Sequence, residues 1–315
     1  MTTLEAISPM TVEGIVAELG ARLTSGTLVR VNEPMAKRTT LRVGGPAELF
    51  VEPQSEADLS TVLSFASVQS LPVTILGRGS NLLVRDGGIH GVVVSMGHAA
   101  FGGIELKGES LHCGAGARLK LLANAARDAG LTGLEFLEGI PGSVGGALRM
   151  NAGAMGSWTF DVVRRVRFMS RDGVAEERPS SQVPVEYRAC PLLRTHIALG
   201  AVFVGKPALV DDVRAKMEAG SRKRWESQPA QPSAGCIFKN PAESPAGKLI
   251  DELGLKGTRV GNAMVSDVHA NFIVNLGGAS AREVLELIEV VRNRVKEKRG
   301  IDLHTEVEIL GQDPI

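Results

Sequence analysis

The sequence predicts an α+β protein made of two regions in which strands and helices are mixed. Short apolar runs alternate with segments of helical apolar spacing, without an internal repeat or a low-complexity linker. Two glycine-rich segments lie in the first region, next to apolar runs. The sequence pattern changes at Lys206-Pro207, where a long amphipathic segment begins. The first region therefore spans roughly 39–205, and the second follows it.

Capping residues and apolar spacing predict the elements of the first region. We expect a helix over Thr11–Arg22, and Ser55 with Asp58 marks the start of a second helix. A third is expected over Arg118–Ala129, because Gly130 favours the left-handed conformation that ends helices. The strands expected from apolar or alternating runs, with a hairpin turn at Asp172-Gly173, are Glu48–Val51, Val73–Leu76, Val92–Met96, Val162–Ser170, Val174–Glu177 and Ile197–Val204.

The second region begins with a long helix that runs from Lys206-Pro207 toward Trp225. A capping pair, Ser280 with Glu283, starts a final long helix that ends at Gly300. The remaining elements expected here are a helix over Ala246–Leu253 and strands over Asn271–Leu276 and Val307–Leu310.

The segment 139–156 carries the strongest functional signal, because six of its eighteen residues are glycine. A backbone without side chains can approach another molecule closely and present its amides. A second bare turn, Gly77–Asn81, lies upstream between apolar runs. Together they indicate a dinucleotide pyrophosphate held from two sides, with a pair of ordinary tight turns as the alternative. Strand and turn, rather than a helix, follow Gly79, so a Rossmann domain is not expected.

Composition narrows the class of protein. Apolar residues make 43% of the chain and charged residues 22%, which is typical of a folded globular protein. Lys plus Arg equals Asp plus Glu at 35 each, which argues against broad binding to nucleic acid or membrane surfaces. Three scattered cysteines and six histidines show no metal-ligand spacing. Met1–Glu5 shows no start of a targeting segment, so we expect a cytoplasmic protein.

Several motifs in order resemble the UDP-N-acetylenolpyruvoylglucosamine reductase family from about residue 32 onward. The motifs that carry this resemblance are Thr40–Gly45, Gly77–Leu83, Gly139–Gly146, Met150–Ala154, Tyr187-Arg188, Gly235–Pro241 and Glu306–Ile309. The resemblance implies an FAD-binding fold of the vanillyl-alcohol-oxidase (PCMH) type, with two α/β subdomains and a separate α/β substrate-binding domain. The boundaries expected are a lead-in over 1–38, subdomains over about 39–97 and 98–205, a substrate-binding domain over 206–303, and a C-terminal strand over 304–315.

The family resemblance also implies a reaction. NADPH would reduce the enolpyruvyl ether of UDP-N-acetylglucosamine to the lactyl ether of UDP-N-acetylmuramate through bound FAD, in cytoplasmic peptidoglycan precursor synthesis. The chain resembles the shorter class of the family and is expected to be a monomer. No histidine lies in Gly77–Asp86, so we expect FAD to be bound without a covalent link.

The residue types fit that chemistry. Hydride addition to an enol ether conjugated to a carboxylate builds negative charge toward the carboxylate, which needs a cation or acid and a proton donor. The resemblance implies that Arg188 pairs with the carboxylate and that Glu306 is the assisting acid. It implies that Cys236 donates the final proton. For Cys236 the alternative is a small buried hydrophobe.

The resemblance assigns the remaining site residues by motif. Substrate contacts are expected from Tyr187, Arg224, Lys239 and Asn240, with core packing, a solvated helix face and a helix cap as the alternatives for Tyr187, Arg224 and Asn240. Arg149 and Ser227 depart from the tyrosine and lysine expected at their positions. A side chain at Gly145 is expected to fill ligand space. The FAD contacts expected are Gly77, Arg78, Gly79, Ser80, Asn81, Leu82, Gly139, Ile140, Pro141, Gly142, Ser143, Gly145, Gly146, Asn151, Ala152 and Gly153.

Two other functions stay open from the sequence alone. One is a related FAD-dependent oxidoreductase that acts on a different small molecule. The other is a non-catalytic flavin- or nucleotide-binding regulator, which would be favoured if Arg188 or Glu306 did not reach the flavin site.

Overall fold

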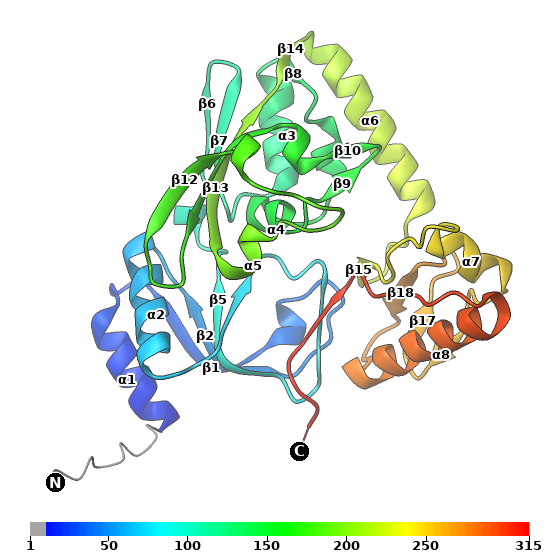
Figure 1. The fold of residues 1–315 in the computed structure, drawn as a ribbon, viewed down its shortest axis with the longest axis horizontal. Helices are drawn as coiled ribbons and strands as arrows, with labels where there is room; N and C mark the ends of the chain where they lie inside the picture. Colours follow the sequence, from blue (N-terminus) through cyan, green and yellow to red (C-terminus); the bar gives the residue numbers. More distant parts are fainter. Residues whose placement is uncertain (1–10, 315) are drawn as a thin grey trace.

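Three packed units and a returning C-terminal strand make up the protein (Figure 1). This computed structural model describes residues 11–314, so the expectation for Met1–Glu5 lies outside the described residues. Each unit combines one sheet with helices, which confirms the mixed α+β class. Within residues 11–314, no helix is both long and apolar enough to cross a bilayer.

The first unit is a four-stranded sheet in the order β1-β2-β5-β3, with β1 antiparallel to β2 and the other neighbours parallel. The Ser55 side chain accepts a hydrogen bond from the Asp58 amide at the start of α2, as the capping pattern predicts. Strand β1 was not expected from the sequence. The elements of this unit are α1 (Val12–Arg22), β1 (Leu28–Pro34), η1 (Met35–Lys37), β2 (Pro46–Glu52), α2 (Glu56–Val68), β3 (Val73–Leu76), β4 (Leu82–Val84), β5 (Ile89–Ser95) and η2 (Ala99–Phe101).

The second unit is a five-stranded antiparallel sheet in the order β12-β11-β13-β7-β6. Its helices pack over the sheet around a core that includes Leu122, Leu148 and Phe168. Its larger elements are β6 (Ile104–Lys107), β7 (Ser110–Gly114), α3 (Leu119–Asp128), α4 (Val144–Arg149), β11 (Val163–Met169), β12 (Ala175–Pro179), α5 (Leu192–Thr195) and β13 (Ile197–Val204). Its shorter elements are β8 (Leu131–Thr132), η3 (Glu135–Gly139), β9 (Gly153–Ala154), β10 (Ser157–Trp158), η4 (Thr159–Asp161), η5 (Ser180–Gln182) and β14 (Lys206–Pro207).

Helix α6 (Val210–Ser227) packs on the second unit through Val213 and Met217, which are buried in the same core as α3. From the sequence we expected this helix in the substrate-binding domain, because the sequence pattern changes at Lys206-Pro207. By packing, α6 instead belongs to the second unit, whereas the core of the third unit is formed by residues from Ala234 onward together with Leu41, Val43 and Leu83 of the first unit. The helix therefore leads from the second unit to the third along the outside of the molecule (Figure 1).

The third unit is an antiparallel sheet in the order β15-β18-β17-β16, covered by α7 and α8. Ser280 and Glu283 form the expected capping box, and Gly300 ends α8 in the left-handed conformation. Val284, Leu287 and further side chains at helical spacing bury one face of α8 in the core. The elements are β15 (Ser233–Cys236), α7 (Ala246–Glu252), β16 (Arg259–Val260), β17 (Ala263–Val265), β18 (Phe272–Asn275) and α8 (Ala281–Arg299).

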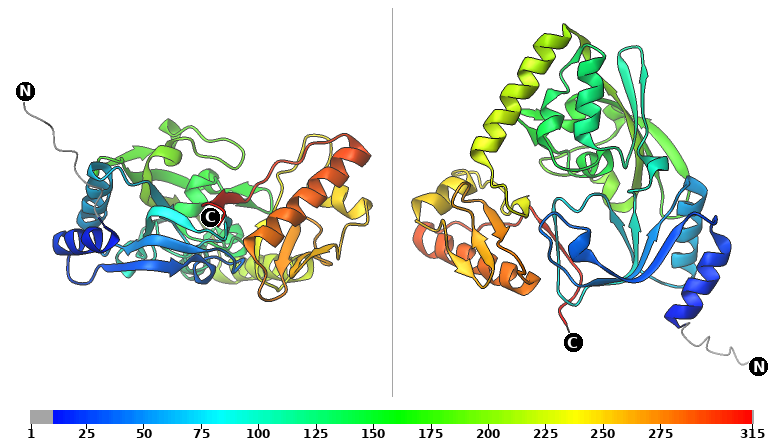
Figure 2. Two further views of the ribbon diagram at one scale, coloured as in Figure 1. Left: turned by 90° about the horizontal axis from the view of Figure 1, so that it is seen from below. Right: turned by 180° about the vertical axis from the view of Figure 1, so that it is seen from behind.

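The chain then returns to the first unit, where β19 (Glu308–Leu310) pairs in parallel with β4 (Figure 2). A further tie joins these units, because the Asp86 carboxylate accepts hydrogen bonds from the first two amides of α8 at 2.8 and 2.9 Å. Asn275 donates to the carbonyl of Leu41 at 3.1 Å. The third unit is thus held against the first on the side where the glycine turn, Gly77–Asn81, lies.

Candidate active site

A cavity of about 770 Å³ lies where the three units meet. Its wall combines the glycine turn after β3, the glycine tract around α4, the end of α6, and the segment that leads into β15. The predicted site residues that line it are Gly77, Arg78, Gly79, Ser80, Asn81, Leu82, Gly139, Ile140, Pro141, Gly142, Ser143, Gly145, Gly146, Ala152, Gly153, Arg188, Arg224, Cys236 and Glu306. Segments far apart in the sequence therefore form one chamber.

Arg188, Glu306 and Cys236 meet on one wall of this cavity. Nε of Arg188 lies 2.8 Å from Oε1 of Glu306, and both side chains are largely buried. The Nε–H is not directed at that oxygen, so this buried donor has no hydrogen-bond acceptor within residues 11–314. Burial raises the pKa of Glu306, whereas the charges of Arg188 and Lys239 oppose that rise. The pair thus combines a largely buried cation with a carboxylate whose pKa is raised by burial.

Arg188 is held in this position by an unusual turn. Its φ of 56° is uncommon for a residue with a side chain. Two backbone hydrogen bonds between Glu186 and Ala189, at 2.8 and 3.2 Å, close the turn around it. The guanidinium also lies 5.2 Å from the ring of Trp158 and 5.5 Å from that of Tyr187. We conclude that the turn and the aromatic rings together aim this cation at Glu306.

Cys236 sits at the end of β15, directly after a break in the register with β18. Gly235 has a φ of 77° in this bulge, a conformation that glycine takes without strain. Burial, helped by the negative charge of Glu306, raises the pKa of the Cys236 thiol from 9.0 to about 11, and Arg188 opposes this. The half-buried thiol is therefore protonated near neutral pH, as a proton donor must be.

The two glycine segments meet each other across the cavity. The Ser80 hydroxyl donates to the carbonyl of Pro141 at 2.8 Å, and a Cβ on Gly142 would lie 3.3 Å from Oγ of Ser80. A Cβ on Gly77 would lie 3.0 Å from Oγ of Ser143. That Oγ is buried and has no hydrogen-bond partner among the described residues. Such an orphaned hydroxyl beside bare backbone fits a ligand rich in acceptors.

Arg78 adds positive charge to the same wall. Burial and the neighbouring charge of Arg118 lower the pKa of Arg78. A partly buried arginine whose charged form is disfavoured in this way is stabilised by an anion beside it. The glycine segments, Ser143 and Arg78 together fit the pyrophosphate of FAD.

Gly145 has a packing role in addition to its place on the cavity wall. A Cβ there would lie 3.1 Å from Cβ of Ala115 and 3.6 Å from Cβ of Ala198, so it would crowd two residues that also line the cavity. The glycine tract is also not a bare loop, because α4 forms within it at Val144–Arg149. Gly145 thus allows α4 to pack closely on the sheet of the second unit.

Several other predicted site residues are used elsewhere. The Asn151 side chain accepts from the amide of Phe160 and donates to the carbonyl of Glu186, and it does not line the cavity. Tyr187 also lies off the wall, with its ring edge-on to Trp158 at 5.6 Å. Asn240 accepts from the amide of Ala246, the first residue of α7, so its side chain supports that helix end although Pro245 is the N-cap residue.

Lys239 and Ser227, like these residues, are absent from the wall. Lys239 nevertheless acts on the site through its charge, which lowers the pKa of Glu306. The Ser227 hydroxyl donates to the carbonyl of Lys223 within its own helix. Ser227 therefore does not take over the role expected of a lysine at that position.

Arg149 and Glu308 form a pair that sequence reasoning missed. Both line the cavity, and the two guanidinium ends of Arg149 reach the two oxygens of Glu308, one at 2.8 Å. This bidentate pair raises the pKa of Arg149. The departure from tyrosine at position 149 was a signal, but its partner lies 159 residues away. The pair ties the glycine tract to β19, directly after Glu306.

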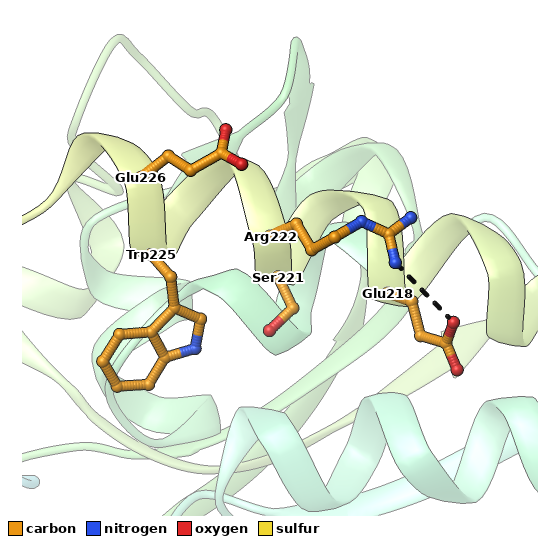
Figure 3. Close-up of a pocket in the computed structure, with 5 residues that line it drawn as sticks. All are labelled: Glu218, Ser221, Arg222, Trp225 and Glu226. Atoms are coloured by element: carbon orange, nitrogen blue, oxygen red, sulfur yellow. Dashed lines mark ion pairs between the residues drawn. The ribbon is translucent and has the colours of Figure 1, made fainter.

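A smaller hollow of about 360 Å³ lies along α6, lined by Glu218, Ser221, Arg222, Trp225 and Glu226 (Figure 3). It is removed from Cys236 and Glu306, whereas Ser221 and Trp225 also belong to the wall of the large cavity. Among the described residues, no group of three or more His, Cys, Asp or Glu side chains is placed to hold a metal ion.

Two family models match the chain. The C-terminal domain of UDP-N-acetylenolpyruvoylglucosamine reductase matches residues 228–310, and an FAD-binding domain matches residues 47–177. The first of these begins after α6, in agreement with the packing of that helix.

Full-length relatives agree with these matches. A protein from Bacillus subtilis named UDP-N-acetylenolpyruvoylglucosamine reductase is 41% identical over 302 residues, which cover 95% of this chain and 99% of that protein. A protein of the same name from Methylorubrum extorquens is 44% identical over 281 residues, which cover 89% and 91%. The crystal structure of UDP-N-acetylenolpyruvylglucosamine reductase from Thermus caldophilus superimposes with a TM-score of 0.78 at 38% identity, covering 90% of this chain and 99% of that one.

Proposed function

The chain belongs to the UDP-N-acetylenolpyruvoylglucosamine reductase family, and we propose from that membership how its own side chains carry the reaction. The protein is an FAD-dependent oxidoreductase that reduces the enolpyruvyl group of a UDP-N-acetylglucosamine derivative in peptidoglycan precursor synthesis. The observation that carries the proposal for the residues is the meeting of Arg188, Glu306 and Cys236 on one cavity wall.

We assign the cofactor to the first two units. Ser143, Arg78 and the amides of Gly79, Ser80 and Gly142 would hold the FAD pyrophosphate, because they provide an orphaned hydroxyl, positive charge and bare backbone. When bound, FAD supplies the hydride that reaches the terminal carbon of the enolpyruvyl group. The sugar nucleotide lies on the wall formed by β15 and the end of α6.

Arg188 binds the enolpyruvyl carboxylate in this proposal. Its Nε–H has no acceptor within residues 11–314, and its charge is largely shielded from water. Negative charge builds on that carboxylate as hydride arrives, so the contact strengthens in the transition state. Glu306 assists by holding the guanidinium of Arg188 in place, and burial raises the pKa of Glu306, so this carboxylate takes up a proton more readily than an exposed one when negative charge develops beside it.

Cys236 completes the addition. Its Sγ–H bond breaks and the proton goes to the carbon next to the carboxylate, which the enolate form of the substrate has made basic. With a pKa of about 11, the thiol keeps its proton until that carbon accepts it. The resulting thiolate regains a proton from water once the product leaves. Hydride and proton together convert the enolpyruvyl ether to the lactyl ether of UDP-N-acetylmuramate.

We propose NADPH as the reductant and a cytoplasmic monomer as the working form. The balance of 35 basic and 35 acidic residues supports a protein that uses neither a nucleic acid nor a membrane surface as a partner. Oxidised holoenzyme should lose its flavin absorption on addition of NADPH without air and regain it on addition of the enolpyruvyl sugar nucleotide. A colourless protein that takes up no FAD would contradict this proposal outright.

Separate half-reactions test the residue roles. Arg188→Ala should spare flavin reduction by NADPH and slow reoxidation by the enolpyruvyl sugar nucleotide by about 100-fold or more. Equal slowing of both half-reactions would show a general structural role instead. The same measurement distinguishes a reductase of this substrate from an oxidoreductase of another one, because only the former is reoxidised by it.

Cys236→Ala should still allow hydride transfer to the substrate and the reverse transfer back to the flavin. Hydrogen from solvent should therefore exchange into the terminal carbon of the substrate without net formation of product. Cys236→Ser should keep part of the activity. Cys113→Ala is the matched control, since it removes another buried thiol that does not line the cavity. Wild-type turnover in Cys236→Ala would return this residue to a packing role.

A further inference from the structure

Trp225 leaves a large apolar ring in water at the end of α6. Its exposed fraction is 73%, although it is one of only two tryptophans in the chain. In Figure 3 its indole projects from α6 on the same side as Ser221, as their spacing of four residues requires. Aromatic side chains exposed in this way are enriched where proteins bind partners or ligands.

The indole stands at the end of a continuous path to the reacting group. Trp225 lines the large cavity, and so does every residue from Gln228 to Cys236. Eleven residue steps separate Trp225 from Cys236 in the sequence. Both ends of this stretch line one continuous cavity wall, so a single elongated ligand can contact both of them. A ligand whose reacting end lies at Cys236 would therefore carry its other end toward Trp225.

Positive charge lies on the same cavity wall as the indole. One guanidinium nitrogen of Arg224 donates to the carbonyl of Gly139 at 2.7 Å, and Nε donates to Oε1 of Gln228 at 3.0 Å. Arg224 is therefore fixed, and it forms no ion pair with the part of the chain that the structure describes. A fixed cation next to an exposed aromatic ring suits a diphosphate joined to a heterocyclic base.

We propose that Trp225 is the stacking platform for the uracil base of the sugar nucleotide, with Arg224 beside the diphosphate. This rests on the proposed function, because it is the enolpyruvyl end of that substrate that must reach Cys236. NADPH also carries bases joined to a diphosphate, so it offers the same chemistry from a second source. The path from Cys236 to Trp225 favours the sugar nucleotide.

Fluorescence titration of holoenzyme tests the platform directly. Trp158→Phe leaves Trp225 as the sole tryptophan, and UDP should then quench its emission in a saturable way. Inorganic pyrophosphate, which has no base, should not. Quenching by NADP⁺ but not by UDP would overturn the assignment to uracil, and quenching by neither would overturn the platform.

Affinity measurements give a second readout. Trp225→Ala should raise the Kd for UDP about 5- to 150-fold, which is the stacking range of about 1–3 kcal/mol converted at about 1.4 kcal/mol per tenfold. Trp225→Phe should recover most of the loss. Leu209→Ala is the matched control, because Leu209 is also 73% exposed but lies at the other end of α6, away from the cavity.

Turnover separates this inference from the function on which it rests. Trp225→Ala should raise KM for the sugar nucleotide, with little change in kcat and none in flavin reduction by NADPH. If holoenzyme binds UDP at Trp225 but the enolpyruvyl sugar nucleotide does not reoxidise the flavin, the proposed function fails while the platform stands. An unchanged Kd for UDP in Trp225→Ala would refute the platform alone.

Discussion

The Cys236 thiol should resist alkylation until the pH is high. Its surroundings raise its pKa from 9.0 to about 11, so the two-unit shift lowers the amount of reactive thiolate about 100-fold below pH 9. At a pH of about 8, about a tenth of an ordinary thiol with a pKa of 9 is ionised, against about a thousandth of Cys236. Alkylation by iodoacetamide should therefore keep accelerating about tenfold per pH unit well beyond pH 9.

The assay is peptide mass spectrometry of Cys236 after timed alkylation across a pH series. The midpoint of the rate profile reports the pKa even if limited access lowers every rate by the same factor. Two variants separate the causes. Glu306→Gln removes a negative charge that raises the pKa, so the midpoint should move down, whereas Arg188→Ala removes a cation that lowers it, so the midpoint should move up. A wild-type midpoint at or below 9, or shifts of the opposite sign, would refute the electrostatic account of this site.

Three further predictions test the walls of the cavity. Ser143→Ala should weaken FAD binding by about 1 kcal/mol, or roughly fivefold, without lowering the melting temperature of the apoprotein, because its hydroxyl has no partner there; unchanged FAD affinity would argue against the proposed contact. A double-mutant cycle of Arg149→Gln and Glu308→Gln, measured by urea unfolding, should give a coupling of up to about 1 kcal/mol in the free energy of unfolding, since both side chains are partly exposed. A coupling of zero would show that the pair does not stabilise the fold. Trp158→Leu should slow flavin reoxidation about 2- to 5-fold, because it removes a cation–π contact with Arg188 worth about 0.5–1 kcal/mol, whereas Trp158→Phe should not slow it. Equal rates in both variants would show that the ring of Trp158 does not position Arg188.

Local patterns predicted the helices that carry their own start and stop signals. The caps at Ser55 and Ser280 and the stop at Gly300 are all where the sequence placed them, because a cap depends on residues within one turn. Helix α4 could not be predicted in this way, since it contains two adjacent glycines and is short. It forms because Val144, Ala147 and Leu148 are buried in the core of the second unit, which is a tertiary effect.

Motifs predicted which residues lie at the site more accurately than they predicted the contacts that each residue makes. Arg188, Cys236 and Glu306 reach one wall from three segments, as the family resemblance implied. Asn151 and Asn240 carry matching motifs, yet their amides serve the backbone. Nothing in a single sequence distinguishes these uses, because an amide side chain satisfies either a ligand or a nearby peptide group equally well.

The order of synthesis gives the returning strand another consequence. Strand β4 finds its strand partner, β19, only at the opposite end of the chain, more than 220 positions later. Domains generally fold from the N-terminus as the chain emerges from the ribosome, so the first two units can fold while β4 still has an unpaired edge. Glu306 arrives with the same strand. A nascent chain can thus build its cofactor cradle early, but it acquires a complete catalytic wall only after residues 306–310 have emerged from the ribosome.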